Sequence, residues 1–453
     1  MATNVDKVKK DIESRYIERT SKSQKYYAEA KKYLPGGETR ESTFFKPHPL
    51  YMERGKGSKL FDYDGNEYID FVGNYTTLIH GHCDPDVSSA VAAQLELGTV
   101  LAAPDPSQTE LGKLIVDRLP SADLVRFTNS GTEATHWAIR AARVFTRRDM
   151  FLKMDGGYNG SHDAVEVNII PDLNPQELPE PKLAGLGIPK SVLDDIALSY
   201  FGDLDSAEAQ LKKHKGKIAA VILEPMLGSL GMIIPTKEYL QGMRELTVKY
   251  DTLLIFDEVM TFRLGIGGLQ EHFGVTPDIT ALGKVIGGGF PVGGFAGRRD
   301  IMDMFEYDPL DPESVNHSGT FNGNNMTMVA GVATLKKFDK KAAKYTNGLG
   351  NKLRDGIDEA FKALGMKGQA TGFGSLVQIH FTDNELKNAY DYVIGLLPNM
   401  EVQRLFHLEL INRGIFTAKR GFFATCTPMT DGEIDKCLEE VKGALEVLKH
   451  LVA

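Results

Sequence analysis

The chain has 453 residues, of which 42% are hydrophobic and 25% are charged, and its formal net charge is −9 at pH 7. This is the composition of an ordinary globular protein, which excludes a largely disordered chain, a collagen-like repeat and a membrane-embedded body. The acidic balance provides no general attraction for nucleic acid or for an anionic membrane, so neither is expected as a partner.

Three cysteines, Cys83, Cys426 and Cys437, are too few for a disulfide framework, and they form no C-x-x-C pair. The first twenty residues are charged throughout and lack the apolar stretch of a signal peptide. No window approaches the roughly 20 apolar residues that are needed to span a bilayer. We therefore expect a cytoplasmic protein, with no metal site indicated.

The N-terminal part of the chain predicts a helix followed by a hairpin. Residues 1–33 are rich in Lys, Glu, Arg and Tyr, which is typical of a surface helix, and the Pro-Gly-Gly break at 35–37 ends it. Within residues 50–72, apolar and polar residues alternate on both sides of Asp64-Gly65. This alternation around a turn dipeptide predicts a β-hairpin.

From about residue 85, continuous apolar runs alternate with longer helical patterns. The apolar runs lie at 124–130, 150–155, 218–226 and 252–260, and helices are predicted over 132–144 and 237–250. Buried strands separated by helices are typical of a mostly parallel sheet that is covered on both faces. The sequence therefore predicts an α/β fold.

The pattern changes again near residue 340. A Lys- and Ala-rich helical stretch is followed by strand patterns at 374–381 and 422–428 and by a last helix over 431–451. We expect a large domain over 76–338 and a smaller α+β domain over 339–453. The N-terminal segment 1–75 is expected to complete the smaller domain, because neither piece alone has enough apolar surface for a core.

Two motifs in the predicted large domain carry chemically capable side chains. Asp257 and Glu258 end an apolar strand, where α/β proteins place their ligand sites, although a strand-capping Asp explains the pattern equally well. Lys284 precedes a glycine run, and such a lysine is usually a solvated loop residue. Val285 follows Lys284 where a phosphate-binding P-loop needs Ser or Thr, so a P-loop is excluded.

Two further motifs complete a possible site. Ser130, Gly131 and Thr132 lie between a strand and a helix, where free backbone N–H groups can bind a phosphate, although an ordinary helix cap explains this segment better by itself. A Gly-rich turn presents Tyr158, and the next residue, Asn159, begins an N-x-[ST] triplet that we attribute to chance. A phosphate cup, an aromatic ring, a carboxylate and a lysine together match the needs of pyridoxal phosphate.

In that order, the segments NSGTEA, DEVMT, GKVIGGGFPVGGFAG and SGTFNGNNMTM resemble the class III aminotransferases, which are fold-type I pyridoxal-phosphate enzymes. The resemblance covers essentially the whole chain. It implies that Lys284 bonds to the cofactor's aldehyde and later carries a proton, and that Asp257 pairs with the pyridinium nitrogen. A buried Lys284 beside a cationic ring is expected to have a lowered pKa.

The resemblance also implies a cofactor pocket at the interface of a homodimer. One subunit would provide phosphate ligands, ring contacts and a supporting carboxylate, and its partner would complete the phosphate cup. The phosphate ligands would be Ser130, Gly131 and Thr132, and Tyr158 and Val259 would contact the two faces of the ring. Glu224 would support the pocket, and Thr320 of the partner subunit would complete the phosphate cup.

The substrate is less well defined by the motifs. Met260 in DEVMT resembles the residue that glutamate-1-semialdehyde aminomutase has at this position of the motif. Arg40 and Arg420 instead resemble the carboxylate-binding arginines of aromatic β-amino-acid (β-phenylalanine) aminotransferases. Each arginine could instead form a surface ion pair. We expect transfer of an amino group from a β-amino acid to 2-oxoglutarate or pyruvate, since a ping-pong enzyme must hold two carboxylates in different places.

Other functions remain as alternatives. Within the same fold, the chain could be a glutamate-1-semialdehyde 2,1-aminomutase or an ω-amine transaminase. A non-catalytic protein of this fold is disfavoured by the intact Lys284 and Asp257. A nucleotide-dependent dehydrogenase is disfavoured because no G-x-G-x-x-G follows a first strand.

Overall fold

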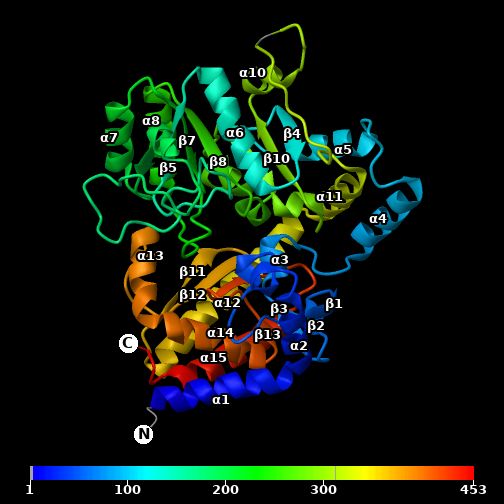
Figure 1. Ribbon diagram of the computed structural model, residues 1–453, viewed down its shortest axis with the longest axis vertical. Helices are drawn as coiled ribbons and strands as arrows, with labels where there is room; N and C mark the ends of the chain where they lie inside the picture. The colour runs from blue at the N-terminus through cyan, green and yellow to red at the C-terminus, as the bar shows by residue number, and fades with distance from the viewer. Residues whose placement is uncertain (1–3, 312, 453) are drawn as a thin grey trace. The chain divides into compact units, whose positions relative to one another are not determined.

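The computed structural model describes residues 4–311 and 313–452 and divides into two compact units (Figure 1). Unit 1 consists of Met1–Asp84, Lys344–Asn384 and Ile394–Ala453, and unit 2 consists of Pro85–Ala343 and Glu385–Val393. No helix in the described ranges combines the length and the apolar character that a membrane crossing requires.

Unit 2 is built on a seven-stranded sheet with the strand order β4-β10-β9-β8-β7-β5-β6 (Figure 1). The strands from β9 to β6 are parallel to one another, and β10 is antiparallel to both of its neighbours. The strands are β4 Leu124–Thr128, β5 Met150–Met154, β6 Ile196–Ser199, β7 Ile218–Leu223, β8 Leu253–Asp257, β9 Ile279–Gly283 and β10 Gly293–Gly297.

The central strands of this sheet explain why the sequence shows continuous apolar runs. Every residue of β5, β7, β8 and β9 is buried, so both faces of the sheet are covered along these strands. The mixed, mostly parallel sheet with its helices confirms the predicted α/β fold class. The helices of unit 2 include α4 Pro85–Leu97, α5 Pro106–Val116, α6 Gly131–Thr146, α7 Leu204–Lys213, α8 Lys237–Lys249, α9 Gly268–Phe273, α10 Arg299–Met302 and α11 Asn325–Lys337.

Strand β10 was not predicted, because its sequence GGFAG has the composition of a loop. Its glycines are required by a close approach of two backbones. A Cβ atom on Gly293 would lie 1.9 Å from the carbonyl oxygen of Ser130. The strand therefore packs directly against the segment that begins α6.

Unit 1 contains two smaller sheets. The first has the order β1-β2-β3-β13 and the second β11-β12-β14, and β13 is parallel to β3. Strands β2 and β3 pair antiparallel around Asp64-Gly65, which confirms the predicted hairpin. The strands are β1 Met52–Lys56, β2 Lys59–Asp62, β3 Glu67–Asp70, β11 Gln369–Phe373, β12 Leu376–His380, β13 Ile415–Phe416 and β14 Phe422–Ala424.

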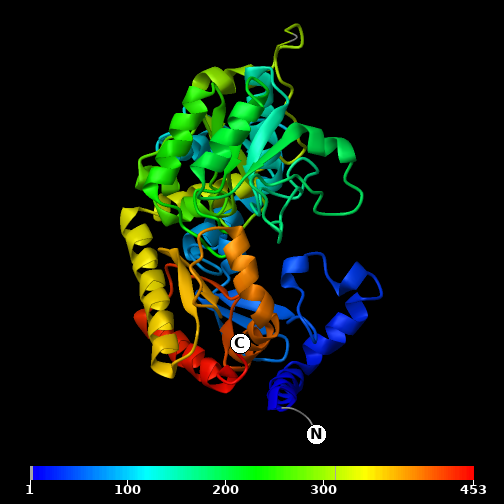
Figure 2. The ribbon, with the colours of Figure 1, turned by 90° about the vertical axis from the view of Figure 1, so that its left-hand side faces the viewer.

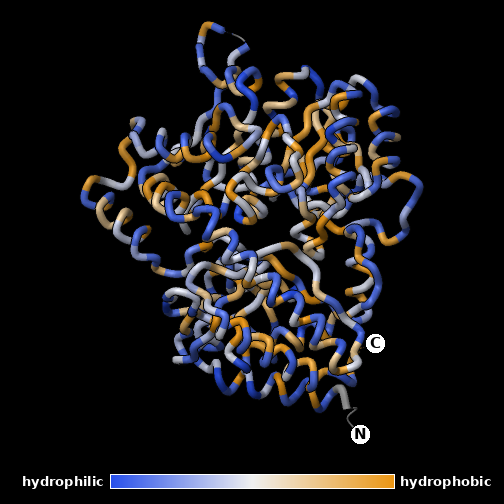
Figure 3. The backbone as a smooth tube through the Cα atoms, turned by 180° about the vertical axis from the view of Figure 1, so that it is seen from behind, coloured by the Kyte–Doolittle hydropathy of each residue, from blue (hydrophilic) through white to orange (hydrophobic). Residues whose placement is uncertain are grey.

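The N-terminal segment forms two helices where one was predicted. The break falls at Thr20, whose side-chain hydroxyl donates to the carbonyl of Tyr16 and thereby competes with the helical backbone bonds. Helix α1 presents the buried Ile12 and Tyr16 to a core that also includes Phe406 and Leu410 of α14. Figure 3 shows the resulting alternation of hydrophilic and hydrophobic colour along α1.

Long helices cover the sheets of unit 1, and Figure 2 shows α12 and α15 beside β11 and β12. Helix α12 has residues in both units, as does α13. The helices are α1 Asn4–Arg19, α2 Ser21–Ala30, α3 Gly73–Thr76, α12 Lys340–Leu364, α13 Ala389–Leu396, α14 Met400–Asn412 and α15 Asp431–Leu448.

Candidate active site

Asp257 is the last residue of β8 in unit 2, and its carboxylate is only 6% exposed. One oxygen, Oδ2, accepts a hydrogen bond from the Asn159 side-chain amide at 3.0 Å. The other, Oδ1, accepts from the Val259 backbone N–H at 3.1 Å. Burial raises the pKa of Asp257, while these two hydrogen bonds and the positive charge of Lys284 act in the opposite direction. The carboxylate thus sits in a dry site among neutral donors.

Glu258, the next residue, has a different role. Its fully buried carboxylate accepts hydrogen bonds from the backbone N–H groups of Leu269 and Gln270, at 2.8 and 3.0 Å, and from the Thr261 hydroxyl at 2.8 Å. These bonds fix the first turn of α9. The structure therefore separates the carboxylate pair of the sequence motif into one group beside Lys284 and one structural group.

Lys284 follows β9 directly and has a backbone φ of +50°. This left-handed conformation is uncommon for a residue other than glycine and is found preferentially at functional sites. The positive charge of Lys284 opposes, more weakly than other groups, the burial that raises the pKa of both Asp257 and Glu224. The structure brings these three predicted residues together at the ends of neighbouring strands.

The start of α6 forms a cradle next to Val259. Ser130 is the N-cap, and its hydroxyl accepts a hydrogen bond from the Glu133 N–H at 3.1 Å, so the capping role considered for this segment is present. A Cβ atom on Gly131 would lie 2.9 Å from a methyl carbon of Val259, so only glycine fits there. The Thr132 hydroxyl accepts a hydrogen bond from the backbone of the Tyr158 turn, at the N–H of Ser161.

Tyr158 is held on a turn by Glu224, which follows β7. The Tyr158 N–H donates to Glu224 Oε1 at 3.3 Å, and Oε2 accepts from the Gly228 N–H at 3.1 Å. Burial, together with the negative charge of Asp257, raises the pKa of Glu224 to about 8. The ring of Tyr158 is 39% exposed, and its hydroxyl lies 3.1 Å from the Ser161 hydroxyl. Glu224 thus fixes the backbone that presents the ring.

Two residues of this site were missed by the sequence analysis. Asn159, assigned there only to a chance triplet, is the side-chain partner of Asp257. Lys153 on β5 is fully buried, and its ammonium donates to the carbonyls of Gly157 and Val167 at 2.9 and 2.6 Å. Burial lowers the pKa of Lys153 to about 8. A lysine inside a continuous apolar run was the only signal in the sequence that could have identified it.

Pyridoxal phosphate fits the residues that are present. The N-terminus of the 16-residue helix α6 offers N–H groups and a favourable dipole to a phosphate. A cationic ring nitrogen would stabilise the buried Asp257, because both of its hydrogen-bond partners are neutral. Lys284 provides the primary amine that an aldehyde cofactor requires, and it directly follows β9, the strand next to the one that Asp257 ends.

Thr320 lies in an exposed turn of unit 2. Within the chain, this turn is tied to the start of α6, because the side-chain amide of Asn129 donates to Asn322 Oδ1 at 2.8 Å. Phe321, beside Thr320, is 55% exposed. An exposed threonine next to a large exposed aromatic ring is available to a second molecule.

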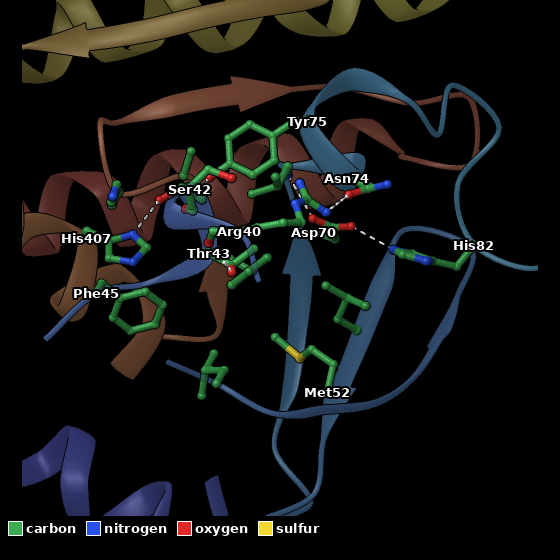
Figure 4. Close-up of a pocket in the computed structure, with 17 residues that line it drawn as sticks. Arg40, Ser42, Thr43, Phe45, Met52, Asp70, Asn74, Tyr75, His82 and His407 are labelled. Atoms are coloured by element: carbon green, nitrogen blue, oxygen red, sulfur yellow. Dashed lines mark hydrogen bonds and ion pairs between the residues drawn. The ribbon is translucent and has the colours of Figure 1, made fainter. Parts of the chain in front are cut away.

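The two predicted substrate arginines lie in unit 1, and one aromatic pair connects them. The guanidinium carbon of Arg40 lies 5.5 Å from the ring centre of Tyr75, and that of Arg420 lies 5.7 Å from the ring centre of Phe422. These rings are stacked, with centres 6.4 Å apart and planes inclined by 24°. Both guanidinium groups act to lower the pKa of Tyr75 against the larger effect of its burial. Arg40 also donates to Asn74 Oδ1 at 2.8 Å (Figure 4).

Known proteins resemble the chain over nearly its whole length. The model of the class-III aminotransferase family matches residues 43–445. A glutamate-1-semialdehyde 2,1-aminomutase of Methanocaldococcus jannaschii is 39% identical over 95% of this chain and 99% of its own.

Two solved structures share the fold. An ω-transaminase from Sphaerobacter thermophilus superimposes with a TM-score of 0.91 at 40% identity and covers 94% of this chain and 98% of its own. A β-phenylalanine aminotransferase from Variovorax paradoxus has a TM-score of 0.89 at 33% identity and covers 99% of both chains.

Proposed function

The chain belongs to the class-III aminotransferase family, and on that premise we propose that its amino donor is a β-amino acid and its acceptor a 2-oxo acid. It is a pyridoxal-phosphate-dependent aminotransferase. Among β-amino acids, an aromatic one such as β-phenylalanine suits the arginines best, and 2-oxoglutarate or pyruvate is the acceptor.

The observation that supports this donor is the pair of arginines on the stacked Tyr75 and Phe422. A 3-amino acid carries its carboxylate one carbon farther from the reacting carbon than a 2-oxo acid does. Two guanidinium groups connected by one aromatic pair can receive these carboxylates in turn. Arginine suits this task because its planar fork binds a carboxylate through two parallel hydrogen bonds.

Pyridoxal phosphate, when bound, supplies an aldehyde that accepts an amino group and a ring that withdraws electrons. Ser130, Gly131 and Thr132 hold its phosphate at the start of α6. Tyr158 and Val259 hold the two faces of the ring, and Glu224 supports Tyr158 through the backbone.

The proton movements are assigned to two side chains. Asp257 keeps a proton on the ring nitrogen, because its buried negative charge is best balanced by a positive one. Lys284 would hold the cofactor at its aldehyde, and its free amino group would carry the proton at the substrate carbon. The strand ends that hold both residues keep them in fixed positions.

A homodimer completes this site, with Thr320 of the partner subunit binding the phosphate. The exposure of Thr320 and Phe321 supports this assignment. Hybrid dimers of the Lys284→Ala and Thr320→Val chains test it, because one of the two sites in each hybrid would have both native residues. Activity well above that of either homodimer is expected, and activity equal to their mean argues against sharing. A cytoplasmic location stays a prediction from the sequence.

Glutamate-1-semialdehyde 2,1-aminomutase is the second candidate. Met260 follows the carboxylate strand as it does in that enzyme, and the aminomutase of M. jannaschii is 39% identical to this chain. An aminomutase returns the amino group to the same carbon skeleton, and therefore needs no second carboxylate position and no external 2-oxo acid.

A panel of amino donors separates the candidates. Initial rates are measured for 3-amino-3-phenylpropanoate and 1-phenylethylamine, each with 2-oxoglutarate and with pyruvate, and for glutamate 1-semialdehyde alone. We expect the β-amino acid to have the highest kcat/KM. A highest value for the semialdehyde supports the aminomutase, and a highest value for the neutral amine supports an ω-amine transaminase.

A further inference from the structure

An arginine–histidine pair of unit 2 lies at the start of the turn that carries Thr320. Arg126 projects from the middle of β4, which is an edge strand of the seven-stranded sheet. Its Nε donates to His317 Nδ1 at 3.0 Å, and its Nη1 donates to the carbonyl oxygen of Phe305 at 2.5 Å. His317 precedes Thr320 by three residues, so this hydrogen bond ties the start of the turn to the sheet.

Aromatic rings fix the orientation of the His317 side chain. The ring centre of Trp137 in α6 lies 4.5 Å from that of the imidazole, and the ring centre of Phe295 in β10 lies 5.4 Å from it. Both ring planes are nearly perpendicular to the imidazole, at 85° and 87°. Such contacts are favourable, because the positive edge of one ring meets the negative face of the other. The imidazole is therefore held by α6 and β10 as well as by Arg126.

The contact with Arg126 determines how His317 is protonated. A guanidinium group only donates hydrogen bonds, so Nδ1 is the acceptor, and the single hydrogen of the neutral ring is on Nε2. Burial, together with the positive charges of Arg126 and Arg140, lowers the pKa of His317 to about 4. The ring is therefore neutral at pH 7, where it can accept the hydrogen bond from Arg126.

The other end of the turn is held by Asn322. The Asn322 N–H donates to the Gly319 carbonyl at 3.0 Å, and a Cβ atom on Gly319 would lie 2.5 Å from Asn322 Oδ1. The Asn322 side chain thus packs on the backbone of the turn. Its Oδ1 accepts from the side-chain amide of Asn129, which directly precedes the N-cap Ser130 of α6. His317 and Asn322 therefore anchor the two ends of one turn.

Thr320 lies between these two anchors and is exposed, as is Phe321. Packing does not position an exposed side chain, so the anchors on either side determine where its hydroxyl lies. We propose that His317 is a positioning residue of the cofactor site: by accepting from Arg126, it holds the Thr320 hydroxyl where the phosphate in the partner subunit binds. This role rests on the proposed sharing of Thr320 between subunits and does not depend on the amino donor.

Hybrid dimers in which only one site contains Lys284 test this role. One chain of each hybrid carries Lys284→Ala, so borohydride can fix the cofactor only at the site of the other chain, the reporting site. The hybrid holoenzyme is diluted into cofactor-free buffer, samples are reduced at intervals, and the cofactor fixed to Lys284 is quantified by peptide mass spectrometry. The decline of this signal gives the rate at which the reporting site loses its cofactor.

The chain that carries His317→Phe decides the expected result. On the Lys284→Ala chain, which supplies Thr320 to the reporting site, it should make cofactor loss at least about tenfold faster, as expected for one lost charge-assisted hydrogen bond. On the other chain it should change the rate by less than about twofold, because the phosphate cup there is still capped by Ser130. Equal acceleration from both positions would make His317 a general structural residue and overturn the inference.

Thr320→Val on the Lys284→Ala chain separates this inference from the shared site on which it rests. Faster loss with Thr320→Val but an unchanged rate with His317→Phe would overturn the role of His317 and leave the sharing of Thr320 intact. An unchanged rate with Thr320→Val would refute the sharing and the role of His317 together.

Two further variants keep the test independent of folding, because His317→Phe leaves Arg126 without this acceptor. His317→Asn places an amide oxygen at the position of Nδ1 and should restore the rate to within about twofold. A rate as fast as that of His317→Phe would contradict the inference.

Asn322→Ala, on the Lys284→Ala chain, releases the other end of the turn and should also speed the loss of cofactor. An unchanged rate would show that the turn needs no anchor, and would overturn the inference. His214→Phe, at a half-buried histidine that ends α7 in unit 2, is the control and should leave the rate unchanged.

Discussion

The region around Lys284 in unit 2 and the arginine region of unit 1 are built differently. Asp257 ends β8, and Lys284 directly follows β9, so hydrogen bonds of one sheet fix both backbones. Arg40 lies between two short 3-10 helices, and Arg420 lies in the turn between β13 and β14. The residues to which we assign the cofactor chemistry are thus held by a rigid sheet, while the arginines to which we assign substrate recognition lie on segments that can change without disturbing that sheet.

The largest expected effect comes from Lys284 itself. Lys284→Ala should lower kcat by about 10³-fold or more, because both the bond to the cofactor and the proton transfer are lost. Borohydride reduction of the native holoenzyme, followed by peptide mass spectrometry, should find the cofactor on this residue. Lys182→Ala, a surface lysine paired with Asp172 in the same unit, is the control and should retain normal activity. Attachment of the cofactor to another lysine would contradict the account of unit 2.

The adjacent Asp257 and Glu258 should separate catalysis from stability. Asp257→Asn should lower kcat by about 10²–10³-fold through loss of the charge opposite the ring nitrogen, with little change in the free energy of unfolding. Glu258→Gln should instead lower the free energy of unfolding by about 1–3 kcal/mol. The substitution replaces one buried carboxylate oxygen with an NH2 group, which then faces the backbone N–H donor of Leu269 or Gln270. Steady-state kinetics and urea denaturation of both variants measure this. Equal kinetic losses would mean that the two carboxylates act as one unit.

The arginines of unit 1 should affect substrate choice and leave the chemical steps intact. Arg420→Ala should reduce kcat/KM for carboxylate-bearing substrates by about 10–100-fold, the range for one charge-assisted hydrogen bond. The value for the neutral 1-phenylethylamine should stay within about twofold, and Arg40→Ala should show the same selectivity. If the neutral amine lost as much as the carboxylates, Arg420 would be a structural residue.

The smallest expected effect concerns Lys153, which supports the turn before Tyr158. Burial lowers its pKa to about 8 in the folded chain, so between about pH 8 and pH 10.5 the unfolded chain binds more protons. This difference makes the contribution of Lys153 to stability rise with pH in that window. From pH 7 to 9.5, the free energy of unfolding of the native protein relative to Lys153→Met should therefore rise by about 1–2 kcal/mol.

Urea denaturation of both proteins at several pH values measures this rise. Lys182→Met, which removes an exposed lysine, should follow the native protein over the same pH range. Parallel pH profiles for the native protein and Lys153→Met would mean that Lys153 does not titrate as its burial requires.

The sequence predicted those parts of the fold and site that depend on local patterns. Apolar runs identify β7 and β8 because both are wholly buried, and Asp64-Gly65 identifies a hairpin because its turn chemistry is local. Strand β10 was missed because its glycines are explained only by the approach of Ser130. The break at Thr20 was missed because it depends on the hydrogen bond that the Thr20 hydroxyl donates to the carbonyl of Tyr16.

The same distinction applies to the site. Asn159 is recognisable only when the chain brings it to Asp257, 98 positions away. The stacking of Tyr75 on Phe422, which connects the two arginines, joins segments even farther apart in the sequence. No local pattern encodes contacts of this kind, so the stacking that connects the two arginines needed the structure, whereas the arginines themselves and the cofactor motif were named from the sequence.

The most direct test of the central claim is a half-reaction without an acceptor. The holoenzyme is mixed with excess 3-amino-3-phenylpropanoate, the change in cofactor absorbance is followed, and the deaminated product is quantified. We predict complete conversion of the cofactor, with one equivalent of product per subunit, and a rate that falls about 10–100-fold in Arg420→Ala. No conversion with this β-amino acid, together with full conversion of glutamate 1-semialdehyde, would contradict the proposed function.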